Sequence, residues 1–392
     1  MKKDTFLVLD GNALLHRAWH AIPPLTTKDG LVVNAAYGFT MIVEKMLEKF
    51  NPTYMAVAWD LPGGTFRHEA YEDYKGTRET KEQELYDQIP IIQELLEAYG
   101  IPSLDAEGFE ADDVIATLAE KDSKKGIHTL VVTGDLDALQ LVSKTTKVVF
   151  FVKGISQTKI YDINAVEERY GLHPDQVIDY KALRGDPSDN IKGVPGIGDK
   201  SATLLVQEFG SVEGIYKALK QGKVLEKFAK KLTGNEEAAL ESKFLVTLIR
   251  DVKLDFKLNE AKVKKPDSAE LLKTFQEYEF RTLVRKYSKN LPSPPQLSPK
   301  KSTKDSIQVV HTNKEFEPLL KTLSKNCVGV AVAEQKQADL FGAVRAALSI
   351  SDGKSTLVIS NPKDDVLVFA KSFLDSCDKV VVHDLKALMH KT

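Results

Sequence analysis

Apolar, β-branched runs alternate with helical patterns through the first 155 residues of this 392-residue chain. The runs are TFLVLD at 5–10, YMAVAWD at 54–60, HTLVVTGD at 128–135 and VVFFVK at 148–153. Between them, residues 34–50 and 85–99 place apolar side chains at helical spacing, and Gly100 is a typical helix stop. Strands that alternate with helices are typical of an α/β domain. We therefore predict a central, mainly parallel sheet with flanking helices over residues 1–162.

The pattern changes twice beyond this region. Residues 163–288 predict short helices separated by glycines, and residues 289–305 are rich in Pro, Ser and Lys, which is typical of a linker. Residues 306–392 contain apolar runs again, such as CVGVAVAEQ and KVVVHD, and predict a second, partial α/β domain. Because this region stops just after a strand, we expect the chain to be a piece of a longer protein.

Composition indicates the cellular compartment of the protein and how it could bind nucleic acid. No run of 18 apolar residues exists, which argues against a membrane span, and Cys327 and Cys377 are the two cysteines, too few for a disulfide framework. A reducing cytoplasm is the expected location. The formal net charge of −2 argues mildly against nucleic-acid binding by bulk charge. Binding to DNA would need local basic patches beside an acidic centre.

Aspartates follow three of the predicted strands directly. Asp10 follows FLVL, Asp60 follows MAVAW, and Asp135 follows TLVVTG. A single aspartate in such a place is usually a turn residue or a helix cap. Three of them at the carboxyl ends of parallel strands indicate a shared ligand crevice, because these ends meet at one edge of the sheet.

Further carboxylates accompany these three. EGFEADDV crowds like charges at a predicted helix start, which by itself is explained as well by a solvated first turn that caps free N–H groups. The complete candidate set is Asp10, Asp60, Glu110, Asp112, Asp113, Asp135, Asp137, Asp186 and Asp189. If most of them face one cleft, cations must offset their repulsion, and all-oxygen ligands favour Mg²⁺ or Mn²⁺. Two such ions are a known device for phosphodiester hydrolysis.

A glycine-rich turn is the second signal. In GDPSDNIKGVPGIGDKSA, Gly193, Gly196 and Gly198 precede a helix that begins near Lys200. One interpretation is an ordinary Gly/Pro turn between helices. The other is a helix-hairpin-helix at 188–210 that holds a duplex backbone without reading its sequence.

Residues 62–84 form a third segment of interest. They contain few aliphatic residues, but they interleave aromatic and basic side chains, which suits single-stranded nucleic acid. The DNA-binding candidates are Phe66, Arg67, Tyr74, Lys75 and Arg78. Six acidic residues dilute the charge, so a polar loop and a substrate gate stay equally open interpretations.

These segments together resemble the 5′-nuclease domain of bacterial DNA polymerase I, of the flap endonuclease superfamily, which has a PIN-like α/β fold. The resemblance covers about residues 4–290 and rests on five segments. They are LVLDGNALLHRAWHAIPPL, TFRHEAYEDYKGTR, GFEADDVIATLA, VVTGDLDALQLV and LRGDPSDNIKGVPGIGDKSA.

The resemblance implies a role for each candidate residue. Asp10, Asp60, Glu110 and Asp112 would surround one Mg²⁺, and Asp113, Asp135, Asp137, Asp186 and Asp189 would serve the second ion or its outer shell. Lys75 and Arg78 would act with Asp112 and Asp135 in catalysis, from a helical arch at about 62–95. Tyr74 and Arg17 would contact the substrate, and a K⁺ ion is associated with the glycine turn.

The region from residue 306 resembles the start of a proofreading 3′-5′ exonuclease domain of ribonuclease-H-like fold, with departures. Ala331 and Ala333 stand where an active domain has Asp-x-Glu, and Leu388 stands where a later metal-binding aspartate is expected. We therefore predict an inactive module.

The function implied is a Mg²⁺-dependent 5′-3′ exonuclease and flap endonuclease. Its substrate would be DNA with 5′ flaps, nicks or RNA primers, and it would act as a bacterial, nucleoid-associated monomer in replication and repair. A PIN-like ribonuclease and a non-catalytic DNA-binding segment of a polymerase are the alternatives. A haloacid-dehalogenase-type phosphatase is disfavoured, because DGN at 10–12 lacks a second carboxylate.

Overall fold

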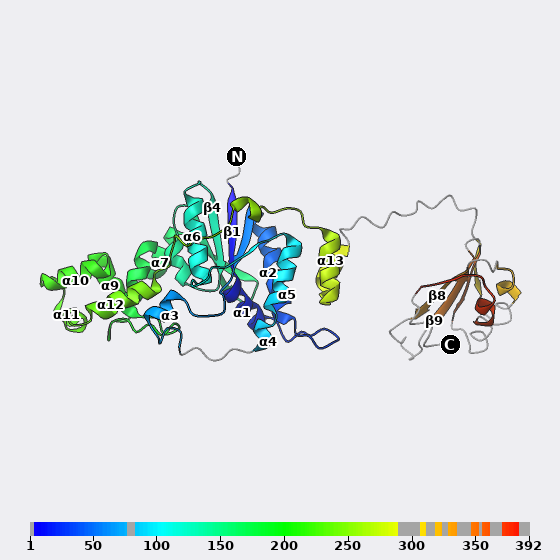
Figure 1. Ribbon diagram of the computed structural model, residues 1–392, viewed down its shortest axis with the longest axis horizontal. Helices are drawn as coiled ribbons and strands as arrows, with labels where there is room; N and C mark the ends of the chain where they lie inside the picture. The colour runs from blue at the N-terminus through cyan, green and yellow to red at the C-terminus, as the bar shows by residue number, and fades with distance from the viewer. Residues whose placement is uncertain are drawn as a thin grey trace. The chain divides into compact units, whose positions relative to one another are not determined.

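A six-stranded sheet forms the centre of residues 1–292, the first of two compact units in the computed structural model (Figure 1). The strands are, in sheet order, β3 (Ser103–Leu104), β2 (Tyr54–Ala58), β1 (Thr5–Asp10), β4 (His128–Thr133), β5 (Thr146–Lys153) and β6 (Gln157–Tyr161). Neighbouring strands pair in parallel from β3 to β5, and β6 pairs antiparallel with β5. The predicted α/β class with a mainly parallel sheet is confirmed.

The structure describes residues 4–76, 83–288, 306–310, 318–323, 328–334, 346–352, 355–360 and 371–383. The predicted linker, Arg78 and Leu388 lie outside these residues, and so do the side chains of Ala331 and Ala333. The second unit, residues 293–392, contains a mixed sheet ordered β11-β8-β9-β10-β7. Its strands are β7 (Ser306–Val310), β8 (Val328–Glu334), β9 (Ala346–Ser351), β10 (Ser355–Ser360) and β11 (Val380–His383). The ribonuclease-H-like and inactive character of this unit stays a prediction.

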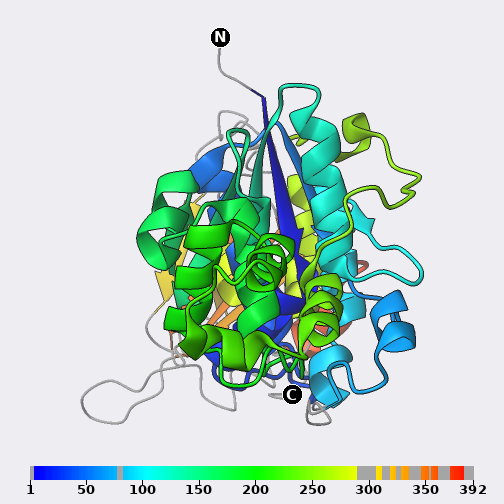
Figure 2. The ribbon, with the colours of Figure 1, turned by 90° about the vertical axis from the view of Figure 1, so that its left-hand side faces the viewer.

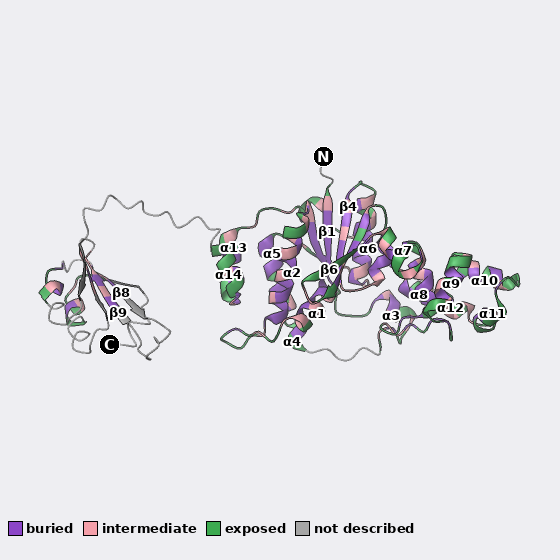
Figure 3. Ribbon diagram, turned by 180° about the vertical axis from the view of Figure 1, so that it is seen from behind, coloured by how far each residue is buried: buried purple, intermediate pink, exposed green. Residues whose placement is uncertain are grey.

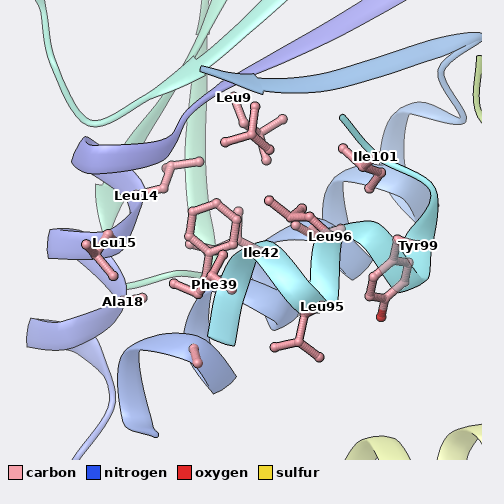
Figure 4. Close-up of a cluster of buried hydrophobic side chains, with 14 of the residues drawn as sticks. Leu9, Leu14, Leu15, Ala18, Phe39, Ile42, Leu95, Leu96, Tyr99 and Ile101 are labelled. Atoms are coloured by element: carbon pink, nitrogen blue, oxygen red, sulfur yellow. The ribbon is translucent and has the colours of Figure 1, made fainter. Parts of the chain in front are cut away.

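Strand β1 is apolar from Phe6 to Leu9 because both faces of the sheet are covered, as the buried strands of Figure 3 show. Leu7 and Leu9 point to one face and Phe6 and Val8 to the other. The first face packs against α1 (Gly11–Ala21), α2 (Asn34–Phe50) and α5 (Ile89–Tyr99), and Figure 4 shows Leu9, Phe39 and Leu96 in this core. The second face packs against α6 (Ala111–Ser123).

A group of short helices follows the sheet (Figure 2). It has its own apolar core. The helices are α7 (Ile163–Tyr170), α8 (Val177–Arg184), α9 (Asp199–Phe209), α10 (Val212–Lys220), α11 (Glu226–Leu232) and α12 (Glu236–Val246). Leu183, Val194, Leu205 and Ile215 are fully or almost fully buried between them. No helix in the described part of the chain is long and apolar enough to cross a membrane.

The last two helices of this unit return to the sheet and do not extend the helical group. Helices α13 (Ser268–Glu277) and α14 (Arg281–Ser288) complete the core on the α2 and α5 face. The Phe275 ring is fully buried, with its centroid 5.2 Å from Tyr287 and 6.3 Å from Tyr99. The predicted helical subdomain at 163–288 therefore does not include these helices, because their apolar faces cover α2 and α5.

We expect Phe275→Ala to destabilise the protein by about 3–5 kcal/mol, because it leaves a cavity in this shared core. The exposed neighbour Gln276 provides the control, and Gln276→Ala should change the free energy of unfolding by less than about 0.5 kcal/mol. Urea unfolding of both variants measures the difference. Equal stability of the two variants would contradict the packing of α13 described above.

Candidate metal and nucleic-acid site

The register of the parallel strands brings three aspartates to one edge of the sheet. Asp10 ends β1 and lies beside Ala58, the last residue of β2. Asp60 follows Ala58 by two positions, and Asp135 follows the end of β4 by two positions. The predicted convergence of Asp10, Asp60 and Asp135 at the carboxyl edge is therefore what the sheet geometry produces.

Asp10 is buried and fixed in orientation. Its Oδ2 accepts a 2.6 Å hydrogen bond from the Thr133 hydroxyl, and its Oδ1 accepts a 3.0 Å bond from the Ala13 N–H at the start of α1. Burial raises the pKa of Asp10 to about 7, against these hydrogen bonds and with the help of the Asp60 and Asp135 charges.

Asp60 fixes the start of α6 at the same edge. Its Oδ1 accepts a 2.7 Å hydrogen bond from the Ala111 N–H, and its own N–H donates to Asn12 Oδ1 at 3.3 Å. The first turn of α6 therefore lies against the aspartates of the sheet, and it brings Asp112 to them.

Asp112 has a carboxylate oxygen that lacks a hydrogen-bond donor among the described residues. This oxygen, Oδ1, is buried. Burial raises the pKa of Asp112 well above its usual value, and the charges of Asp10, Asp135, Asp60 and Asp137 add to this effect. A buried carboxylate oxygen without a donor costs free energy unless a cation binds to it.

Asp113 points away from this group and is neutralised by Arg67. The guanidinium donates two hydrogen bonds to the Asp113 carboxylate, at 2.7 and 2.8 Å, and Ile249 N–H donates a third at 2.8 Å. These bonds occupy both oxygens of Asp113, so a direct metal-ligand role does not fit the structure, and an outer-shell role stays a prediction.

The same contacts exclude a direct DNA-binding role for Arg67. The side chain is 1% exposed, and it also donates to the carbonyls of Leu245 and Thr247, both at 2.9 Å. Arg67 therefore joins the base of the predicted arch, the start of α6 and the end of α12 from inside the molecule.

Glu110 and Asp189 lie at the base of the predicted arch. Lys75 Nζ is 2.7 Å from Glu110 Oε1 and 3.9 Å from Asp189 Oδ2. The Tyr74 hydroxyl is 3.2 Å from Glu110 Oε2 and 3.3 Å from Asp189 Oδ2. Burial and these two charges raise the pKa of Tyr74, so its hydroxyl keeps its proton. Tyr74 is 4% exposed, so it supports Lys75 and does not itself present a face to DNA.

Asp137 and Asp186 share a lysine that our sequence analysis missed. Lys181, on α8, is buried and contacts Asp137 Oδ1 and, at 2.7 Å, Asp186 Oδ2. Burial and the charge of Asp135 raise the pKa of Asp137 to about 8, although Lys181 opposes this shift. Lys181 lies five residues before Asp186 in the sequence, which could have indicated the ion pair, but a lysine in a helix is usually solvated.

Four aspartates therefore differ from the other five candidates. In the described part of the chain, no basic side chain forms an ion pair with Asp10, Asp60, Asp112 or Asp135. No three described His, Cys, Asp or Glu side chains stand close enough to form a finished ligand set for a metal ion. The all-oxygen chemistry of these four aspartates and the unpartnered Asp112 oxygen nevertheless fit hard divalent cations.

Arg17 and Phe66, two further predicted DNA-binding residues, both contact aromatic rings. Arg17, on α1, is partly exposed, donates to the Phe151 carbonyl and lies over the Phe151 ring. Phe66 packs against the rings of Phe109 and Phe244, with centroids 5.7 and 5.8 Å away. It is therefore part of a small aromatic cluster.

The glycine turn connects α8 to α9. Gly193 has a φ of +63°, and a Cβ there would lie 2.3 Å from the Gly185 nitrogen, so only glycine fits. Val194 and Ile197 anchor the turn in the helical core, and Lys231 Nζ donates to the Gly196 carbonyl at 2.8 Å. Gly198 and Lys200 are exposed at the start of α9. The range predicted for a helix-hairpin-helix, 188–210, contains α9 but not α8, which ends at residue 184, and the motif stays a prediction.

We expect Arg67→Met to lower the free energy of unfolding by about 3–5 kcal/mol, because it leaves the Asp113 charge buried and unpaired. The double variant Arg67→Met/Asp113→Leu removes both charges and should regain most of this loss. Urea unfolding in EDTA measures all three proteins. A single variant as stable as the wild type would contradict the structural role of the pair.

Two consecutive family models match the chain. The 5′-3′ exonuclease N-terminal resolvase-like domain matches residues 5–171, and the 5′-3′ exonuclease C-terminal SAM fold matches residues 172–269. The boundary between the two lies between α7 and α8.

Curated relatives agree with these models. The chain is 41% identical to DNA polymerase I of Bacillus caldotenax over 286 residues and 40% identical to that of Bacillus subtilis (strain 168) over 287 residues. Each alignment covers 73% of this chain and 32% of the relative, so the chain spans about a third of the length of these relatives.

Solved structures share the fold. The T5 D15 protein co-crystallized with metal ions has a TM-score of 0.53 at 20% identity, over 73% of this chain and 97% of that one. The catalytic core of Rad2 in complex with DNA substrate has a TM-score of 0.51 at 19% identity, over 74% of this chain and 93% of that one. The chain belongs to the 5′-3′ exonuclease family, and it carries both domains of that family in consecutive segments.

Proposed function

We propose that this chain is a structure-specific nuclease that hydrolyses phosphodiester bonds near the 5′ ends of DNA, at flaps, nicks and RNA primers. The observation that carries the proposal is the group of four aspartates at one edge of the sheet without a cationic partner among the described residues, with one buried Asp112 oxygen unpartnered. Membership of the 5′-3′ exonuclease family supports the reaction class.

Divalent metal ions, Mg²⁺ or Mn²⁺, are part of the proposal. Asp10, Asp60, Asp112 and Asp135 would hold one ion, with Glu110 beside them. Asp137, Asp186 and Asp189 would hold a second ion, and Lys181 would give up part of its contact with the first two. When bound, such ions lower the pKa of a water and stabilise the charge that develops on the phosphate. The T5 protein, which shares the fold and was crystallized with metal ions, supports the use of metal ions.

The protein's own residues would position and neutralise the substrate. Lys75, held against Glu110, would stabilise negative charge on the scissile phosphate, and Arg78 would act with it from the arch. Arg17 would contact a phosphate near Asp135, because its guanidinium lies near Gly134. The glycine turn and Lys200 would hold the duplex.

A K⁺ ion at the turn is included in the proposal, and it would have to use carbonyls other than that of Gly196, which is bonded to Lys231. We further propose that the chain works as a monomer in the bacterial cytoplasm, with the nucleoid, in replication and repair.

Cleavage should depend fully on a divalent metal. We expect a 5′-labelled double-flap DNA to be cut near the flap junction in Mg²⁺ and to stay intact in EDTA, with activity restored by Mg²⁺ or Mn²⁺. Mapping of the product ends should give a 5′-phosphate and a 3′-hydroxyl. Single-stranded RNA, tested in parallel, should be cut much more slowly. Preferred cutting of RNA would favour a PIN-like ribonuclease, and no cutting of either substrate would support a non-catalytic segment.

Asp112→Asn should reduce cleavage by at least about 100-fold, since changes in the partners of metal ligands alone change activity by about 10- to 100-fold. The variant should still bind flap DNA. It should also unfold at a higher urea concentration than the wild type in EDTA, because it removes a buried charge beside like charges. Asp251→Asn, at an exposed position, is the control. Wild-type cleavage by Asp112→Asn would contradict the metal site.

A further inference from the structure

A continuous groove runs from the carboxylates to the start of α9. One cavity of about 680 Å³ lies between α7, α8 and α9 and reaches Lys200 and Leu204. A second cavity of about 470 Å³ reaches Asp135, Asp137 and Asp186. The two cavities share four lining residues, which makes them one groove. The shared residues are Arg169, Tyr170, Tyr180 and Asp199.

Two arginines that do not belong to the candidate metal site line this groove. The Arg169 guanidinium lies over the rings of Tyr161 and Tyr170, at 6.0 and 5.4 Å from their centroids, and donates to the Tyr161 hydroxyl at 3.2 Å. These contacts fix the direction of an exposed cation, which lowers the entropy lost when it binds an anion. Arg184, at the end of α8, forms an ion pair with Asp199 and stays partly exposed.

We propose that Arg169 and Arg184 bind phosphates of one strand of duplex DNA along this groove, between the glycine turn and the carboxylates. The inference rests on the proposed function, and it assigns the strand path and two residues that contact it. A phosphodiester chain suits the groove because Arg169 and Lys200 line its outer cavity and Arg184 lines its inner cavity. The inner end is acidic and would receive the strand with metal ions.

In the proposal, the negative charge of Asp199 weakens the binding of DNA phosphates in this groove. Asp199 Oδ1 accepts a 2.6 Å hydrogen bond from the Tyr180 hydroxyl and pairs with Arg184, and these contacts lower the pKa of Asp199, so it is charged at neutral pH. Its negative charge faces the same groove, where it would repel a phosphate and hold Arg184 back. Removal of this charge should therefore tighten DNA binding, whereas removal of either arginine charge should weaken it.

The test measures binding of a fluorescent flap DNA to the whole chain by anisotropy in EDTA, over a range of salt concentrations. Arg169→Gln and Arg184→Gln should each weaken binding, with the slope of log K against log salt reduced by about one. Asp199→Asn should strengthen binding by about 2- to 5-fold, the usual size of one exposed charge interaction. Lys124→Gln is the control, since Lys124 is exposed at the far end of α6 and should leave affinity and slope unchanged.

Cleavage in Mg²⁺ separates this inference from the proposed function. For the two arginine variants, KM should rise while kcat at saturating DNA stays close to the wild-type value, and a structural defect would instead lower the unfolding midpoint and kcat. Unchanged affinity and slope in both variants, beside normal wild-type cleavage, would overturn the groove and leave the nuclease assignment intact. A wild type that binds as expected but does not cleave would overturn the assignment instead.

Discussion

Repulsion between carboxylates that meet at the edge of a parallel sheet is the constraint on which this structure depends. Two such charges about 4 Å apart repel by about 4 kcal/mol at a partly buried site. The register of β1, β2 and β4 forces Asp10, Asp60 and Asp135 to the same edge, and the Asp60 bond to Ala111 brings Asp112 to them. Among the described residues, no basic side chain pairs with these four aspartates. The arrangement of the sheet and α6 therefore requires another cation to offset their charges.

The surrounding structure neutralises the other carboxylates from within. Arg67 holds Asp113, Lys75 holds Glu110, and Lys181 joins Asp137 to Asp186. Each of these cations also ties segments that are far apart in the sequence. Arg67 is the clearest case, since it joins the arch base to α6 and to the end of α12, where the helical domain meets the sheet domain. The end of α12 is thus coupled to the start of α6, beside the acidic site, through a buried ion pair.

The sequence was sufficient to predict the sheet and the edge aspartates, because strand periodicity and the geometry of parallel sheets are local and general. It was not sufficient to separate Asp112 from Asp113. Adjacent residues at the start of a helix point in directions about 100° apart, and which one meets Arg67 depends on where residue 67 lies in space. The pairing of Lys181 and the return of α13 to the sheet were hidden for the same reason, since both depend on contacts between distant segments.

Direct counting of bound metal tests the central claim most directly. Free Mn²⁺ measured by electron paramagnetic resonance, during titration of the whole chain without DNA, reports how many ions bind and how tightly. The account predicts up to two bound ions for the wild type, and loss of the tighter one in a variant that carries Asp10→Asn and Asp112→Asn. Binding of Mn²⁺ by that variant with wild-type number and affinity would contradict it.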